Sequence, residues 1–71
     1  MTGNEFVRRV RNLGRSRGVP VSLEPTRGKG SHARLEYGKR FTVVKDRRKQ
    51  LGPGLLATML RQLGLTREDI R

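Results

Sequence analysis

Hydrophobic side chains near the start of the chain recur at the spacing of one face of a helix. Thr2 and Glu5 form a capping-box pattern, in which each side chain bonds the backbone N–H of the other residue. Gly18 and Pro20 end the pattern, because proline cannot continue a helix. We therefore predict a helix that starts at once and ends near residue 18. Its buried face would comprise Phe6, Val7, Val10 and Leu13.

Hydrophobic and polar positions alternate through the middle of the chain, which is typical of half-buried strands. Pro20 places the first strand at a sheet edge, because proline cannot donate a hydrogen bond to a neighbouring strand. Matching the hydrophobic faces of the other two strands requires a turn of three residues, 38–40, with Tyr37 opposite Phe41. A turn of two residues, 38–39, would reverse one of the faces. The alternating sets are Val19, Val21 and Leu23, then Ala33, Leu35 and Tyr37, and then Phe41 and Val43.

A second helical pattern follows Pro53, a residue that is tolerated in the first turn of a helix. Gly64 is a natural C-terminal cap, and Thr66 with Asp69 predicts one more short turn. The sequence thus predicts a single α+β domain over residues 1–71. In it, a three-stranded antiparallel sheet carries two helices on one face, in the order α-β-β-β-α. The hydrophobic face of the second helix would comprise Leu55, Leu56, Met59, Leu60 and Leu63.

The charge of the chain is strongly positive and unevenly distributed. Seventeen lysine and arginine residues against six aspartate and glutamate residues give a formal net charge of +11. Residues 1–50 hold 14 of the 17 basic and four of the six acidic side chains, so their net charge is +10. Such an excess predicts a polyanion bound to the first two thirds of the chain. Nucleic acid is favoured over a merely solvated surface, and an acidic protein partner would explain the same charge.

Size and composition exclude several classes of protein. A 71-residue domain has little room for a large internal pocket, so we expect no small-molecule ligand. There is no cysteine for a disulfide, a thiol nucleophile or a thiolate metal site. Glu24, Glu36 and Asp46 lack the spacing of metal ligands, which predicts no metal and no cofactor. No segment resembles a membrane span or a signal peptide, which predicts a cytoplasmic protein without a membrane partner.

The basic, glycine-rich stretch over residues 27–32 carries the candidate chemistry. Gly28 and Gly30 allow the backbone to turn tightly, and successive N–H groups in such a loop can bind an anion. His32 can accept or donate a proton near neutral pH, beside a bound phosphate. Alternation places His32 and Arg34 on the open face of the sheet, in surroundings without carboxylates that favour the neutral imidazole. The alternation and helical spacing assign all three aromatic side chains to the core, namely Phe6, Tyr37 and Phe41. None would then remain to stack on bases.

The order of elements and three sequence segments resemble the HicA family of mRNA interferase toxins. The resemblance covers the chain from Arg27 almost to its end, and its most specific part is the step Gly30-Ser31-His32. The family implies a fold like that of double-stranded-RNA-binding domains, RNA cleavage that requires a histidine at the position of His32, and a cognate HicB antitoxin that covers it. Many members have a proline and a second histidine after the third strand, where this chain has Val44-Lys45-Asp46. The three segments are 28–32, 41–44 and 51–66.

Residues and resemblance together predict an endoribonuclease toxin that cleaves single-stranded or messenger RNA without a metal. His32 is the candidate catalytic residue, which either removes the proton of a ribose 2′-hydroxyl or protonates the leaving 5′-oxygen. A HicB-like acidic antitoxin is the expected protein partner. The alternative is a non-catalytic RNA-binding module of the same fold, in which His32 only contacts a phosphate. The candidate phosphate-binding residues are Arg27, Lys29, Gly30, Ser31, Arg34 and Lys45.

Overall fold

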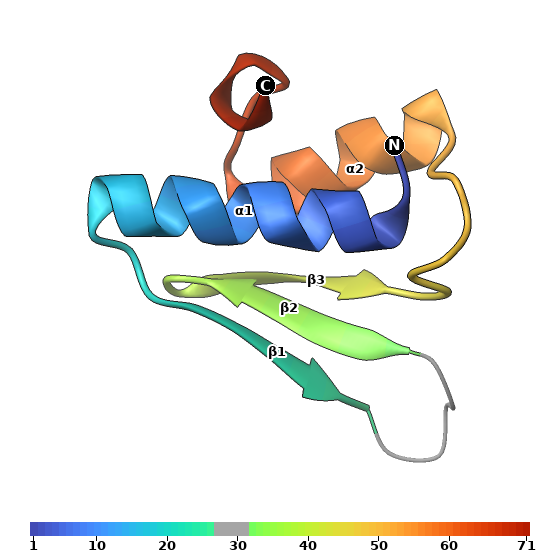
Figure 1. Cartoon of the computed structure of the whole chain (residues 1–71), viewed down its shortest axis with the longest axis horizontal. Helices are drawn as coiled ribbons and strands as arrows, with labels where there is room; N and C mark the ends of the chain where they lie inside the picture. Colours follow the sequence, from blue (N-terminus) through green and yellow to red (C-terminus); the bar gives the residue numbers. More distant parts are fainter. Residues whose placement is uncertain (27–31) are drawn as a thin grey trace.

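The chain folds in the predicted order, with both helices on one face of an antiparallel sheet (Figure 1). The computed structural model describes residues 1–26 and 32–71. Strand β2 lies between β1 and β3, which confirms the edge position predicted for the strand after Pro20. Within the described ranges, no helix is both long and apolar enough to cross a lipid bilayer. The elements are α1 (Gly3–Arg17), β1 (Val21–Pro25), β2 (Ala33–Tyr37), β3 (Arg40–Val44), α2 (Pro53–Leu63) and a final 3-10 turn, η1 (Glu68–Ile70).

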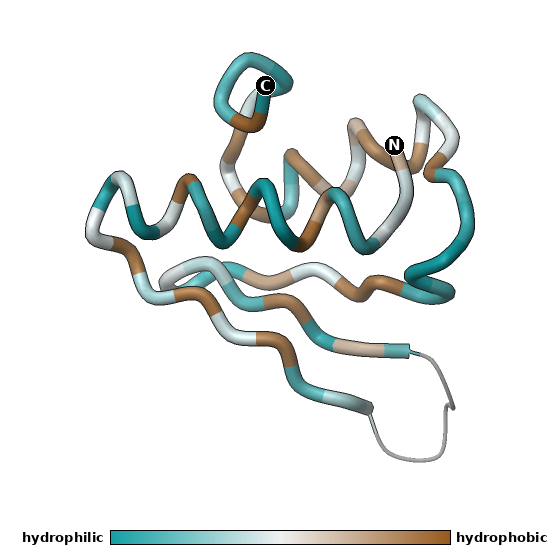
Figure 2. Tube along the Cα trace, in the orientation of Figure 1, coloured by the Kyte–Doolittle hydropathy of each residue, from teal (hydrophilic) through white to brown (hydrophobic). Residues whose placement is uncertain are grey.

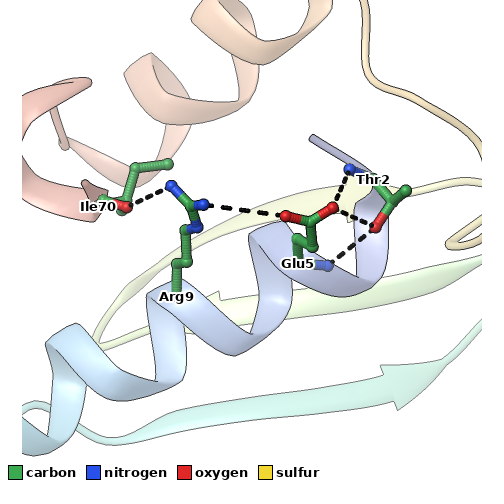
Figure 3. A network of polar contacts seen from close by, with 4 residues as sticks. All are labelled: Thr2, Glu5, Arg9 and Ile70. Atoms are coloured by element: carbon green, nitrogen blue, oxygen red, sulfur yellow. Dashed lines mark hydrogen bonds and ion pairs between the residues drawn. The ribbon is translucent and has the colours of Figure 1, made fainter.

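Helix α1 begins at the predicted capping box. The Glu5 N–H donates to the Thr2 hydroxyl at 3.2 Å, and the Glu5 carboxylate accepts from the Thr2 N–H at 3.4 Å. Arg9, one turn later, lies 3.8 Å from the same carboxylate and donates to the Ile70 carbonyl oxygen at 3.3 Å (Figure 3). One polar network therefore provides hydrogen-bond partners for backbone N–H groups at the start of α1 and links the C-terminal turn to the helix.

The hydrophobic core lies between the two helices and the inner face of the sheet. Phe6 and Val10 of α1 and Leu35 of β2 are fully buried in it. Ile70 returns from the C-terminal turn to the same cluster. Hydrophobic and polar positions alternate along β1 and recur along the helices (Figure 2), so each element turns one face to the core. Helix α2 contributes Leu56, Met59, Leu60 and Leu63.

The turn between β2 and β3 corrects the register predicted from the sequence. Tyr37 pairs with Arg40 rather than with Phe41, so the turn has two residues. Its first residue, Gly38, has a φ of 61°, the positive value that a type II′ hairpin turn needs at this position. The shorter turn reverses the faces of β3, and Phe41 and Val43 are 45% and 39% exposed on the open side of the sheet.

Thr42 and Val44 take the core positions on β3 that the prediction assigned to Phe41 and Val43. Thr42 pairs with Leu35, and both Thr42 and Val44 are buried. The buried hydroxyl of Thr42 donates a hydrogen bond to the side-chain oxygen of Gln62 on α2. A polar side chain is therefore accepted in the core, because its hydroxyl finds a partner there.

Leu55 departs from the predicted hydrophobic face of α2. Its side chain is 47% exposed, whereas that of Leu56 is buried. Leu55 lies in the first turn of the helix and lines a hollow beside β3 instead of the core. The prediction was wrong for this residue because a helix on the surface of a small domain turns only part of its circumference to the sheet.

Gly14 lets α1 and the start of β1 approach each other closely. A Cβ atom at this position would lie 2.4 Å from Cγ2 of Val21 and 2.7 Å from the carbonyl oxygen of Val19. Both distances are shorter than a van der Waals contact. The glycine that weakens the helix in isolation is thus required by the packing of the strand on it.

Gly14→Ala is expected to destabilise the protein, although alanine favours a helix over glycine by about 1 kcal/mol. The added methyl group must displace Val21 and the backbone at Val19, and overpacking of this kind costs about 1–3 kcal/mol. Gly54→Ala on α2 is the matched control, since nothing lies within 4 Å of its added Cβ. Urea unfolding measures both variants. A Gly14→Ala protein as stable as the Gly54→Ala protein would contradict the close approach.

Val43→Ala and Val44→Ala test the register of β3 with the same chemical change at adjacent positions. Val44 is buried, so its truncation is expected to lower the free energy of unfolding by about 1–2 kcal/mol. Val43 is exposed, so its truncation should change stability by only about 0.5 kcal/mol. Denaturant unfolding of the two variants decides between the registers. If Val43→Ala were the more destabilising of the two, the three-residue turn would be supported instead.

Candidate active site

The connection between β3 and α2 is folded against the start of α1. The Asn4 N–H donates to the Arg47 carbonyl oxygen at 2.8 Å, and the Gly3 N–H donates to the Lys49 carbonyl oxygen at 3.2 Å. The first N–H groups of a helix have no partners within the helix, so these two bonds satisfy two of them. The hydrophilic connection is thereby held at the end of the molecule where β2 starts (Figures 1 and 2).

His32 lies directly before β2, at this same end of the molecule. Its carbonyl oxygen accepts from the Thr26 N–H at 3.1 Å and from the Thr26 hydroxyl at 3.3 Å. The next residue, Ala33, pairs with Val44 at the end of β3. The backbone from the His32 carbonyl group onward is therefore held by hydrogen bonds to Thr26 and by pairing with β3. The half-buried His32 lies beside the point where the chain leaves β3.

A hollow of about 490 Å³ lies between β3, the connection and the start of α2. We name it the histidine hollow. Its titratable side chains are His32, Lys45, Asp46 and Lys49. Val43 and Leu55, two of the hydrophobic residues that the prediction misplaced in the core, lie on its apolar side. The hollow can thus hold a phosphate near two ammonium groups and the base or sugar of a nucleotide against apolar atoms.

Asp46 corrects the expectation that no carboxylate surrounds His32. Its Oδ1 accepts from the backbone N–H of Arg48 at 3.0 Å and lies 3.7 Å from the Arg48 guanidinium. The backbone hydrogen bond is the main cause that lowers the pKa of Asp46 below its ordinary value of 3.8, and the charges of Arg48 and Lys49 act in the same direction. Asp46 is therefore ionised at neutral pH.

Arg34 lies on the open face of the sheet, as predicted, and it is engaged there. Its Nε is 3.0 Å from the Glu36 carboxylate, and its guanidinium lies 3.8 Å from the centre of the Phe41 ring. Ser22 donates to the same Glu36 carboxylate at 3.2 Å. Phe41 is thus an exposed aromatic residue, contrary to the prediction that every aromatic side chain is in the core. Arg34 is not among the residues that line the histidine hollow.

The predicted site residues have different outcomes. The structure brings His32 and Lys45 together in the histidine hollow. It adds Lys49, which the sequence analysis did not single out, and Asp46, which the sequence analysis considered only as a metal ligand and rejected. No local sequence pattern indicated them, because their place beside His32 depends on the pairing of Ala33 with Val44, which the sequence did not predict. The predicted phosphate-binding residues that lie outside the described residues are Arg27, Lys29, Gly30 and Ser31.

The candidate ligands of a metal ion in this chain are its histidine and carboxylate side chains, since it has no cysteine. In the part of the chain that the structure describes, no three of them lie together as potential ligands of one metal ion. The titratable groups that line the histidine hollow are an imidazole, two ammonium groups and a carboxylate. Proton exchange at the imidazole and stabilisation of negative charge by the lysines are what this set offers.

Comparison with known families gives one match, which lies over the candidate site. Residues 22–65 match the family described as the HicA toxin of bacterial toxin–antitoxin systems. A search of curated proteins and a search of solved structures gave no match. The matched region runs from β1 to just beyond α2 and contains the whole histidine hollow. It covers 44 of the 71 residues. The chain therefore belongs to the HicA family of bacterial toxins.

Proposed function

We propose that this toxin is a metal-independent endoribonuclease that cleaves messenger RNA with His32 as its catalytic residue. The observation that carries the proposal is the position of the chain's single histidine in one hollow with Lys45 and Lys49. An imidazole exchanges protons near neutral pH, and the two ammonium groups attract a phosphate to it. A net charge of +11 supplies the long-range attraction for a polyanionic substrate.

The proposed reaction uses the ribose 2′-hydroxyl of the RNA as its nucleophile. The 2′-oxygen forms a bond to the adjacent phosphorus, the bond from phosphorus to the 5′-oxygen breaks, and a cyclic phosphate results. His32 either receives the proton of the 2′-hydroxyl or gives a proton to the departing 5′-oxygen. Lys45 and Lys49 stabilise the additional negative charge on the phosphate oxygens in the transition state. DNA lacks the 2′-hydroxyl, so it is not a substrate.

Because its carboxylate is ionised, Asp46 can take only some of the roles in the proposed reaction. A carboxylate whose pKa lies below 3.8 carries no proton at neutral pH, so Asp46 cannot protonate the leaving oxygen. Its charge offsets part of the positive charge of the two lysines beside it. In this assignment the second proton transfer of the reaction is left to water or to a lysine.

An acidic antitoxin of the HicB type is the proposed protein partner. The family is that of toxins in toxin–antitoxin systems, in which an inhibitory partner is expected. The histidine hollow combines exposed lysines with the exposed hydrophobic side chains of Val43 and Leu55. A partner with acidic and apolar side chains would cover both features and exclude RNA from His32.

A non-catalytic RNA-binding module is the alternative function. One observation favours it: of the titratable side chains that line the hollow, His32 is the only one of a type that ordinarily exchanges protons near neutral pH. In a non-catalytic module, the imidazole of His32 would only donate a hydrogen bond to a phosphate. The two functions differ in whether the RNA is cut.

His32→Ala is expected to abolish cleavage of a labelled single-stranded RNA in excess EDTA, with a loss of at least about 100-fold in kcat. The imidazole transfers the proton, whereas most of the affinity comes from the basic surface, so RNA binding should fall only slightly. Gel analysis of the fragments and a binding titration measure the two effects. A DNA oligonucleotide of the same sequence is the control and should remain intact. Equal cleavage by both proteins would refute the role of His32, and binding without cleavage by either would favour the RNA-binding module.

The carboxyl group of Asp46 is expected to titrate below pH 3.8, because the folded state favours its charged form. Its contribution to folding is therefore present above pH 3.8 and is lost as the pH falls through the folded-state pKa. NMR of the side-chain carboxyl carbon measures the midpoint. Arg48→Ala should retain most of the depression, because the backbone N–H of residue 48 is its main cause. A midpoint at or above 3.8 would contradict the lowered pKa of Asp46.

A further inference from the structure

A second basic surface follows one side of α1, apart from the histidine hollow. Arg8, Arg11 and Arg15 recur at intervals of three and four residues, which places them in a row on the helix. Together with Arg47 of the connection they line a separate open hollow of about 430 Å³. We name these four residues the arginine track.

The charges of the arginine track are not neutralised by the protein. Within residues 1–26 and 32–71, none of the four guanidinium groups lies in an ion pair, and residues 27–31 contain no acidic side chain. The hydrogen bond of Arg15 to the Asn12 side chain leaves its charge in place. The open face of the sheet differs, because it carries Glu24 and Glu36. The ion pairs of the described residues are Glu5 with Arg9, Glu36 with Arg34, Asp46 with Arg48 and Asp69 with Arg17.

The spacing of the track suits the backbone of a nucleic-acid strand. Seven residues of helix separate Arg8 from Arg15, which corresponds to about 10 Å along the axis. A stacked strand presents a phosphate about every 3.4 Å of its axis, so the track spans about three nucleotides. Arginine donates paired hydrogen bonds to phosphate oxygens, which a flexible lysine cannot do.

The floor of this hollow argues against a protein as the occupant. Val7 and Leu23 contribute its apolar atoms, and the remaining side chains that line it are Asn4 and the arginines. The hot spots of stable protein interfaces are enriched in tryptophan and tyrosine as well as arginine, and they lie in fully desolvated pockets rather than in an open hollow. The side chains described in this hollow include no aromatic one.

The connection joins the arginine track to the histidine hollow. Lys45, Asp46 and Lys49 line the histidine hollow, whereas Arg47, in the middle of the same segment, belongs to the arginine track. The bond from the Asn4 N–H to the Arg47 carbonyl oxygen holds this segment against α1. A strand with one phosphate at His32 can therefore continue over the connection onto the helix.

We propose that the arginine track is a second RNA-binding surface, which holds the phosphates of the strand beyond the one that is cleaved. The identification of RNA as the polyanion rests on the proposed function. The track sets how much of the strand the toxin holds, independently of the chemistry at His32. It binds through phosphates and not through bases, so it adds affinity without sequence preference.

Binding of RNA by His32→Ala proteins over a range of salt concentrations tests the track. The test variant carries Arg8→Gln, Arg11→Gln and Arg15→Gln. The matched control loses the same three charges at exposed positions elsewhere, through Arg61→Gln, Arg67→Gln and Arg71→Gln. Glutamine has nearly the helix propensity of arginine, and urea unfolding verifies that both variants fold. The probe is a fluorescent RNA of about 12 nucleotides, within the usual site sizes of single-strand-binding domains.

The slope of log K against log salt should be smaller by about 2 in the test variant, since each phosphate contact on a single strand contributes about 0.7. The control should retain most of the slope. A dinucleotide is too short to reach both surfaces, so the gain in affinity from dinucleotide to the longer RNA should shrink at least about tenfold in the test variant only. Replacement of the same three arginines by lysine should restore most of the slope, because the charge is retained.

Two results would overturn the proposal: equal slopes in the test variant and the control, or an unchanged gain with RNA length in the test variant. Either would leave the track for another partner, such as an acidic protein. The proposed function fails separately. If the wild-type protein cuts no RNA but the slopes differ as expected, the track stands and the nuclease does not. If RNA is cut at His32 and the slopes are equal, the nuclease stands and the track does not.

Discussion

The two-residue turn at Gly38 determines which side chains of β3 reach the core and which reach the candidate site. Its positive φ permits a tight hairpin whose twist matches the twist of the strands. Tyr37 then pairs with Arg40, and every later residue of β3 is placed by this pairing. A shift of one residue would exchange the core and solvent faces of the strand. It would also move Lys45 and Asp46 relative to His32.

The connection after β3 serves both the fold and the candidate site. Its backbone carbonyl groups accept hydrogen bonds from the first N–H groups of α1, at Gly3 and Asn4. Its side chains line the histidine hollow on one side and the arginine track on the other. The bonds that complete the helix therefore also position the charged groups, and a change that frees this segment would affect stability and the arrangement of both charged surfaces together.

The acidic residues that form ion pairs among the described residues do so with basic residues outside the arginine track, so these pairs do not offset the positive charge of the track. Four of the six carboxylates take part in ion pairs, which leaves the arginines of the track without partners within the described residues. Exposed ion pairs contribute little to stability, so their main effect here is on where the positive potential remains. Arginines without an ion pair among the described residues remain at Arg8, Arg11 and Arg15 of α1 and at Arg47 of the connection, whereas the open face of the sheet carries Glu24 and Glu36.

The sequence by itself determined the elements, because caps, proline and hydrophobic spacing are local signals. It gave the bounds of α1, the edge position of β1 and the family, and it identified His32 as the candidate for catalysis. Only the tertiary structure decided the register of β3, because adjacent Val43 and Val44 fit either face equally well. Thr42 is acceptable in the core only because Gln62, far along the chain, accepts its hydrogen bond. The place of Lys49 and Asp46 beside His32 follows from that register and could not be read from local patterns.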